Sequence, residues 1–158
     1  MRCILFALAL LLPLAPEQSE AFVFKKVVYS SPVEGTIHWG GKPLPNVTIT
    51  RELYSGGFKS DRYEDTAQTN SQGAFNLPVV EERRLFRPDL LSANPTVYQS
   101  MTLIFDGRRY AFWSHSKHNF FERSEGTGGV LIIDCDLSKH EDHDDFRIVR
   151  CKHNGSER

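Results

Sequence analysis

The chain has 158 residues, of which 40% are hydrophobic and 25% are charged. This composition indicates a single globular domain and excludes a disordered chain. The 19 basic and 20 acidic residues give a net charge of −1. A chain without a basic surplus does not fit a dedicated nucleic-acid-binding protein, and no enzyme signature stands out.

The N-terminus has the pattern of a secretory signal peptide. A basic residue precedes the apolar run 4–12, and Ser19 and Ala21 place small residues at positions −3 and −1 of a cleavage site. The apolar run is shorter than the roughly 20 residues needed to span a bilayer. We therefore predict a signal peptide at 1–21 and one mature domain at 22–158, exported to the periplasm or the exterior and without a transmembrane segment.

Cleavage of the signal peptide removes Cys3 and leaves two cysteines, Cys135 and Cys151. An exported chain with an even number of cysteines is expected to oxidise them. Each cysteine is an even number of positions from apolar residues of its predicted strand and therefore lies on their face, so both are expected to point inward. We predict a Cys135–Cys151 disulfide; the alternative is a pair of separate buried thiols.

The mature chain reads as short strands divided by turns. Strands are predicted, in chain order, at 33–39, 47–54, 66–69, 75–79, 97–105, 110–115, 130–137 and 146–151. Gly40-Gly41 and Asp106-Gly107 suit tight hairpins, and 70–73 suits a turn. The charged stretch 81–95 is predicted to be one long connection. The pattern indicates an all-β Greek-key sandwich of about seven to eight antiparallel strands.

The first half of the mature chain resembles a known family. Three segments resemble carboxypeptidase-regulatory-like domains, which are related to transthyretin (prealbumin). They are the sequence Val33-Glu34-Gly35-Thr36-Ile37, the loop and strand at 41–49, and the turn and strand at 65–77. This resemblance covers 33–80. It implies a seven-stranded Greek-key sandwich, and it implies that the matched residues direct folding and have no chemical role.

The second half is similar to a narrower group of small exported bacterial proteins of unknown function. The similarity rests on Gln99, Tyr110, Trp113, the stretch 117–122 and Cys135-Asp136-Leu137. It implies a Gram-negative envelope setting and supplies no activity.

The segment 134–145 contains the residue types that bind metal ions. His140 and His143 are spaced i, i+3 among acidic residues. A zinc site needs three or four ligands that converge, and this spacing converges well only on a helix. We predict a solvated acidic loop without a metal or other cofactor. The alternative is a metal-dependent or hydrolytic secreted enzyme that uses this loop.

Aromatic residues and cations crowd the predicted hairpin and the loop that follows it. Simple alternation places Tyr110 and Phe112 on the face opposite Trp113, so one set is expected to be exposed. Aromatic and arginine side chains are common anchors of interfaces. We predict a non-catalytic binding module whose partner is an unknown protein or envelope component. Its predicted surface consists of Tyr110, Phe112, Trp113, Phe120, Phe121 and Arg123; the alternative is that these side chains form the core.

Overall fold

The structure is a computed structural model that describes residues 24–55, 61–85, 95–122 and 124–155. The predicted signal peptide at 1–21 lies outside the described residues. No helix in the described ranges is long and apolar enough to cross a membrane.

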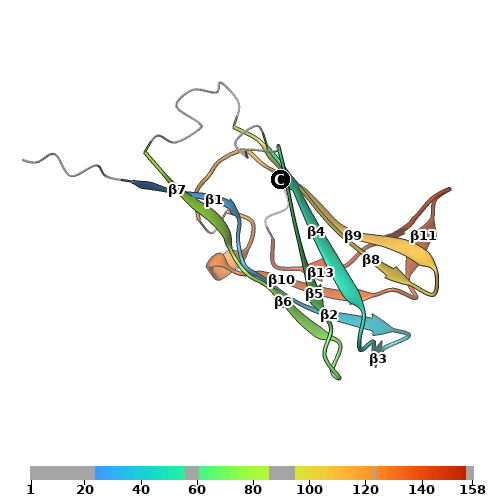
Figure 1. Cartoon of the computed structure of the whole chain (residues 1–158). Coiled ribbons are helices and arrows are strands. Elements are labelled where there is room, and N and C mark those ends of the chain that lie inside the picture. The colour runs from blue at the N-terminus through green and yellow to red at the C-terminus, as the bar shows by residue number, and fades with distance from the viewer. Residues whose placement is uncertain (1–23, 56–60, 86–94, 123, 156–158) are drawn as a thin grey trace, which may run out of the picture.

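The regular secondary structure of the described chain consists almost entirely of β-strands, as predicted (Figure 1). The strands are β1 (Lys25–Ser30), β2 (Val33–Trp39), β3 (Lys42–Pro43), β4 (Thr48–Tyr54), β5 (Arg62–Gln68), β6 (Ala74–Leu77), β7 (Val80–Arg84), β8 (Val97–Phe105), β9 (Arg108–Lys117), β10 (Leu131–Asp136), β11 (His140–Asp142), β12 (Arg147–Val149) and β13 (Lys152–His153). One short 3-10 helix spans Thr127–Gly129.

The strands form two large sheets and one small one. The first sheet has the order β13-β10-β2-β3, with β6 also paired to β2; the second has the order β11-β12-β9-β8-β4-β5. Strands β1 and β7 make a separate pair. Figure 1 shows β2, β6 and β10 in one layer and β4, β8 and β9 in the other. The all-β, sandwich-like class is therefore confirmed.

Three sequence expectations about the strands are wrong. The sheets are mixed, because β10 runs parallel to β2 and β12 runs parallel to β9. The stretch 81–95 is not one connection, because its first residues belong to β7, which pairs with β1. Residues 86–94 lie outside the described residues. The segment 138–145 is likewise more than a loop, since β11 forms a hairpin with β12.

Both predicted glycine hairpins are present. Gly40 and Gly41 have φ angles of 59° and 77°, and Asp106 and Gly107 have φ angles of 50° and 67°. Two consecutive residues with positive φ match the twist of the flanking strands, which is why such pairs connect hairpins. The second hairpin joins β8 to β9 and thereby fixes the register of the longest strand pair.

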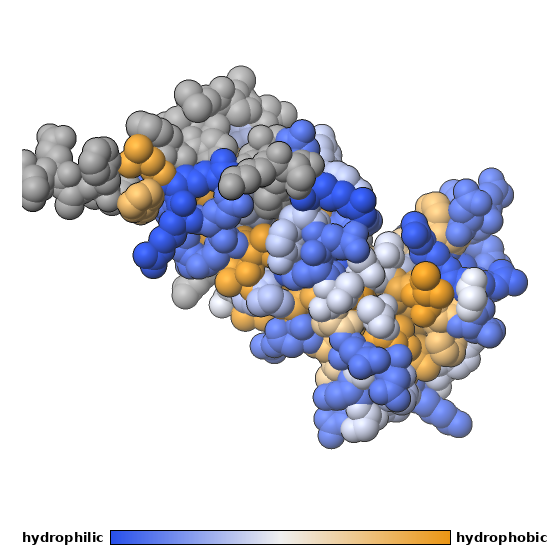
Figure 2. All heavy atoms as spheres, in the orientation of Figure 1, coloured by the Kyte–Doolittle hydropathy of each residue, from blue (hydrophilic) through white to orange (hydrophobic). Residues whose placement is uncertain are grey.

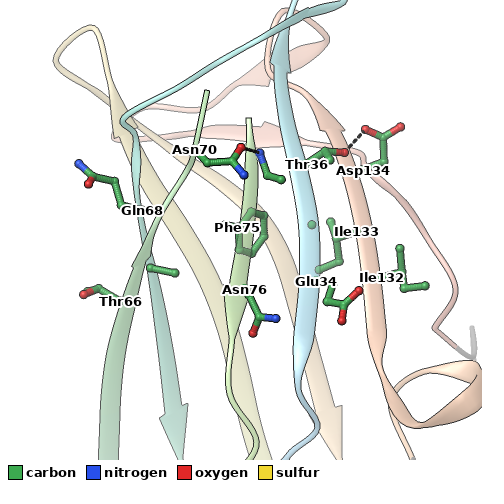
Figure 3. Close-up of a pocket in the computed structure, with 13 residues that line it drawn as sticks. Glu34, Thr36, Thr66, Gln68, Asn70, Phe75, Asn76, Ile132, Ile133 and Asp134 are labelled. Carbon is green, nitrogen blue, oxygen red and sulfur yellow. Dashed lines mark hydrogen bonds between the residues drawn. The ribbon is translucent and has the colours of Figure 1, made fainter. Parts of the chain in front are cut away.

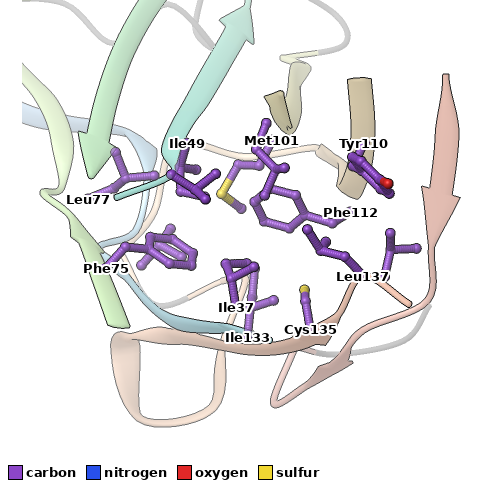
Figure 4. Packing of buried hydrophobic residues seen from close by; sticks show 14 of the residues in the cluster. Ile37, Ile49, Phe75, Leu77, Met101, Tyr110, Phe112, Ile133, Cys135 and Leu137 are labelled. Atoms are coloured by element: carbon purple, nitrogen blue, oxygen red, sulfur yellow. The ribbon is translucent and has the colours of Figure 1, made fainter. Parts of the chain in front are cut away.

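The interior has two apolar clusters. The larger lies between the two sheets and includes Ile37, Ile49, Phe75, Met101 and Ile133 (Figure 4). The smaller packs under the β1–β7 pair and consists of Val27, Tyr29, Leu53, Val80, Val97 and Phe120. Figure 2 shows hydrophobic residues as a band through the middle of the molecule with hydrophilic residues on either side.

Strand β9 contains a β-bulge at Phe112. Thr102 pairs with Ala111 and Met101 pairs with Trp113, so Phe112 has no partner residue on β8. The extra residue shifts the alternation of β9 by one position. Trp113 consequently lies on the same side of the sheet as the buried Met101.

Candidate functional site

The predicted aromatic surface does not form one surface. Tyr110, Phe112 and Phe120 are buried, with exposed fractions of 0%, 4% and 3%. Phe121 is exposed, and Arg123 lies outside the described residues. The expectation that one alternating set is exposed is wrong, because the bulge at Phe112 turns successive aromatic side chains toward the interior.

The buried aromatic residues have packing partners in different parts of the interior. Phe112 meets the ring of Phe75 edge-to-face at 6.2 Å between centroids. Phe120 meets Tyr29 in the smaller cluster at 5.5 Å. The Tyr110 hydroxyl accepts a hydrogen bond of 2.6 Å from Arg147. These three side chains therefore stabilise the fold.

Trp113 lies half-buried at the edge of the larger cluster. Its indole packs edge-on against the imidazole of His153 at 5.0 Å and stacks on His115 at 5.8 Å. The indole nitrogen is buried and has no hydrogen-bond partner among the described residues. The buried apolar area of the ring stabilises the folded state, whereas the unsatisfied N–H donor destabilises it.

We expect Trp113→Ala to lower the free energy of unfolding by about 2 kcal/mol, less than for a fully buried tryptophan. Trp113→Phe should lower it by less than about 1 kcal/mol, because it keeps an aromatic ring and removes the unsatisfied donor. Urea unfolding of both variants measures the difference. Equal losses in the two variants would show that the ring does not supply the stability.

The two histidines of the predicted loop are engaged in separate contacts. Nδ1 of His140 lies 2.8 Å from the carbonyl oxygen of Leu137. The His140 ring is edge-on to the ring of Tyr110, with 5.7 Å between the ring centroids. His143 stacks on Phe146 at 5.3 Å. Across the described ranges, no three or more His, Cys, Asp or Glu side chains gather in a group that could hold a metal ion.

The predicted disulfide is present. Cys135 and Cys151 are bonded, with their Cα atoms 4.5 Å apart. Cys135 belongs to β10 in one sheet, while Cys151 follows β12, which belongs to the other. The bridge therefore fastens the two layers to each other at the point where the chain passes from one to the other.

A buried polar network that the sequence analysis missed separates the two apolar clusters. Arg51 is 1% exposed, and on β4 it lies between Ile49 of the larger cluster and Leu53 of the smaller one. Its guanidinium donates to both carboxylate oxygens of Asp65, at 2.9 Å and 2.5 Å, and to the carbonyl oxygen of Pro78 at 2.8 Å. The arginine is therefore buried with its charge paired.

The other half of the network is an ion pair between Lys117 and Glu125, whose side chains are each 1% exposed. The ammonium nitrogen lies 3.3 Å from both carboxylate oxygens. Glu125 also accepts hydrogen bonds from the Ser31 backbone and hydroxyl at 3.0 Å and 2.6 Å, from Gln99 at 2.9 Å and from Ser124 at 3.1 Å. The network connects β8, β9 and the end of β1 through one carboxylate.

Burial and charge shift the pKa values of this pair. Burial lowers the pKa of Lys117, and the neighbouring Glu125 offsets part of that effect. Burial opposes ionisation of Glu125, but the charge of Lys117 and the donors on Ser31 and Gln99 outweigh it, so the pKa of Glu125 lies below its ordinary value. No solvent-exposed atom takes part in this pair, and we interpret it as a structural element.

The outer side of the six-stranded sheet carries the most prominent exposed aromatic pair. Tyr54 on β4 and Tyr98 on β8 are directly opposite in register, and they are 42% and 59% exposed. We name this side the tyrosine face. It consists of the outward side chains Thr50, Glu52, Tyr54, Arg62, Glu64, Tyr98, Ser100, Thr102, Ser114 and Ser116, which the strand registers place in adjoining rows.

One arginine organises the charged part of this face. Arg62 lies opposite Tyr54 in register, and its guanidinium carbon is 5.8 Å from the centre of the Tyr54 ring. The same guanidinium donates to the carboxylates of Glu52 and, at 2.6 Å, Glu64. The Tyr54 hydroxyl and these carboxylates raise the pKa of Arg62 above its ordinary value. These contacts fix Arg62 beside the ring.

A groove of about 600 Å³ extends from this cluster along β4 and β8 toward the β8–β9 hairpin, and its lining includes neither Tyr54 nor Tyr98. Its floor includes threonines of β4 and β8, and its far end reaches the β8–β9 hairpin at Asp106 and Arg109. A volume of this size is within the range of small-molecule binding sites.

A second groove, of about 740 Å³, lies between β5 and the five-stranded sheet (Figure 3). Thr36 and Asp134 face each other across β2 and β10 and are joined by a hydrogen bond of 2.8 Å. The ring of Phe75 packs against Gly35, where a Cβ atom would lie 2.3 Å from the ring. The side chains that line this groove include Glu34 and Asp134 but no cation. Its one aromatic ring, Phe75, is buried.

Comparison with known proteins identifies the family of the chain. A family model with the description "Domain of unknown function (DUF6795)" matches residues 33–140. The chain belongs to the DUF6795 family. The matched range begins at β2 and ends at the start of β11, so this family definition covers most strands of both large sheets and the whole tyrosine face.

The other comparisons add little. No curated protein matches the chain. Among solved structures, a chlorocatechol 1,2-dioxygenase from Pseudomonas putida aligns with 15% sequence identity and a TM-score of 0.27. The alignment covers 87% of this chain and 60% of the dioxygenase chain.

Proposed function

We propose that this DUF6795 protein is an exported, non-catalytic binding module of the bacterial envelope and that the tyrosine face is its binding surface. The observation that carries the proposal is the pairing of two exposed tyrosines beside a groove. Adjacent exposed aromatic side chains with polar groups around them are candidate interaction sites. This surface replaces the predicted one, of which Tyr110, Phe112 and Phe120 are buried.

The pattern at 1–21 and the Cys135–Cys151 disulfide support export, since disulfides persist in oxidising compartments. We further propose that 33–80 is related to carboxypeptidase-regulatory-like, transthyretin-like domains, on the basis of the motifs at 33–49 and 65–77. Such domains are scaffolds, so the relation is consistent with a binding role.

The test begins with the full chain expressed in a Gram-negative host. Mature protein recovered from the periplasm should begin at Phe22. When this protein is mixed with isolated, insoluble envelope material, it should sediment with that material. Tyr54→Ala/Tyr98→Ala should reduce the bound fraction by about tenfold, because the anchoring rings are lost.

The matched control is Ile132→Ala. Ile132 is 52% exposed but belongs to the outer side of the other sheet. It should leave both sedimentation and the melting temperature unchanged. If the tyrosine double variant sediments as well as the control variant does, the tyrosine face is not the binding surface. If the chain stays unprocessed in the cytoplasm, the export part of the proposal is wrong.

A further inference from the structure

The tyrosine face has the chemistry of a surface for polar, uncharged ligands. Its first row runs Arg62, Tyr54, Tyr98 and Ser116, and its second runs Glu64, Glu52, Ser100 and Ser114. Aromatic rings therefore lie next to hydroxyl groups and one carboxylate–guanidinium cluster. The rings offer flat apolar area, while the neighbouring groups offer hydrogen-bond donors and acceptors at fixed positions.

The charged side chains of this face are largely paired with one another. Arg62 is bound by both Glu52 and Glu64, and Arg109 lies at the other end of the groove. Two arginines against Glu52, Glu64 and Asp106 give the groove a net formal charge of −1. A nucleic acid or another polyanion needs a surplus of cations, which this surface lacks. A polyanion therefore gains no net attraction here, and a polycation gains little from a single excess negative charge.

The position of the face in the sheet also bears on the class of ligand. Strands β4 and β8 are central in the sheet and are paired on both edges, so their backbone groups are used by the neighbouring strands. A peptide that adds as a strand requires an open sheet edge, where backbone donors and acceptors are free. Around Tyr54 and Tyr98 the face offers side chains only, since its one end strand is β5, which carries Arg62 and Glu64. A ligand here must be recognised through ring stacking and side-chain hydrogen bonds.

From these observations we propose that the tyrosine face binds a neutral oligosaccharide chain. Sugar rings present C–H groups on their faces and hydroxyl groups around their edges. One ring would stack on Tyr98 and its neighbour on Tyr54, while Glu52 and Arg62 hydrogen-bond to the hydroxyls. The groove of about 600 Å³ then receives the next units of the chain along the threonines of β4 and β8.

This inference rests on the proposed function, since it names the ligand class of the same surface. The test is isothermal titration of the mature protein with three neutral hexasaccharides: cellohexaose, maltohexaose and chitohexaose. At least one should bind, and raising the salt concentration should not weaken its binding because a neutral sugar carries no charge that salt could screen. Tyr98→Ala should weaken binding by about tenfold.

Tyr98→Phe keeps the ring and should retain most of the affinity that Tyr98→Ala loses. If the role of Tyr98 were purely structural, Tyr98→Ala would instead lower the melting temperature. Ile132→Ala is again the control. Failure of all three sugars to bind would overturn the inference, as would tighter and salt-sensitive binding of dextran sulfate. If the sugars fail but the tyrosine-dependent sedimentation with envelope material persists, the proposed function stands and only the ligand class is wrong.

Discussion

Glu125→Gln should lower the free energy of unfolding by about 3 kcal/mol, the scale on which a buried ion pair is broken when one partner is removed. Lys117 donates to no acceptor other than the two Glu125 oxygens in the described chain. The variant therefore leaves an ammonium group buried at 1% exposure without a counter-charge. Chemical unfolding in urea measures the loss.

The opposite single variant should cost less. Lys117→Met leaves Glu125 with its donors on Ser31, Gln99 and Ser124, so the carboxylate keeps most of its hydrogen bonds. The double variant Lys117→Met/Glu125→Gln should be more stable than Glu125→Gln alone, because no charge then remains buried without a partner. A double variant whose loss equals the sum of the two single losses would show that the pair is not coupled.

An exposed ion pair in the same chain provides the control. Arg150 and Glu141 are 3.0 Å apart, but their side chains are 82% and 60% exposed. Glu141→Gln should leave the unfolding free energy nearly unchanged, because water screens such pairs. If Glu125→Gln has as small an effect as Glu141→Gln, the burial of the Lys117–Glu125 pair does not increase its contribution to the free energy of unfolding.

The same pair gives a pH dependence with a definite sign. The pKa of Glu125 is lower in the folded state than in the unfolded chain. The carboxylate therefore contributes its full stability above its unfolded pKa of about 4.3, and the contribution falls as the pH drops through the lower folded value. Acid unfolding of the wild-type protein should begin in this window, and Glu125→Gln should show a weaker dependence there.

The fold class and most strands could be predicted because their side chains alternate cleanly. Strand β2 buries Val33, Gly35 and Ile37 and leaves the residues between them exposed or partly exposed. Strand β1 shows no such alternation, since its last four residues are all buried and its first two are exposed lysines. Its partner β7 is mostly charged and is joined to β1 by contacts such as Lys26 with Glu81 at 2.7 Å. Periodicity cannot indicate a strand of this kind.

The buried network left a signal in the sequence that could have been used. Arg51 lies in phase with Ile49 and Leu53, and Gln99 lies in phase with Val97 and Met101. A polar side chain in the inward phase of a strand indicates a buried, paired group. The identity of its partner could not be read in this way, because Glu125 comes from an irregular loop and Lys117 reaches the interior only after the bulge.

The tyrosine face was missed for a related reason. Tyr54 is in phase with Glu52 and Thr50, and Tyr98 with Ser100 and Thr102, so each could be assigned to a polar face. The two tyrosines are 44 positions apart in the sequence, and only the register of β4 with β8 places them side by side. Clustering along the sequence instead favoured Tyr110 to Arg123, and within it the bulge in β9 places Phe112 and Trp113 toward the interior together with Tyr110.

Opening the Cys135–Cys151 disulfide should lower the free energy of unfolding by about 3 kcal/mol. The cysteines are 16 residues apart, and closing a loop of about this length restricts the unfolded chain by that amount in the chain-entropy description. For a domain of this size the melting temperature should fall by roughly 10 °C. The effect should be seen with Cys135→Ala/Cys151→Ala as well as with reduced wild-type protein.

Alkylation followed by peptide mapping establishes the starting state: without reduction neither Cys135 nor Cys151 should be labelled, and with reduction both should be. Because the bridge joins β10 to the segment after β12, its loss should loosen the contact between the two sheets while leaving the pairing of β4 with β8 in place. Hydrogen exchange should therefore rise at β12 and β13 and stay slow at β4. Labelled thiols in the unreduced protein, or equal melting temperatures for the oxidised and reduced forms, would contradict a stabilising bridge between the sheets.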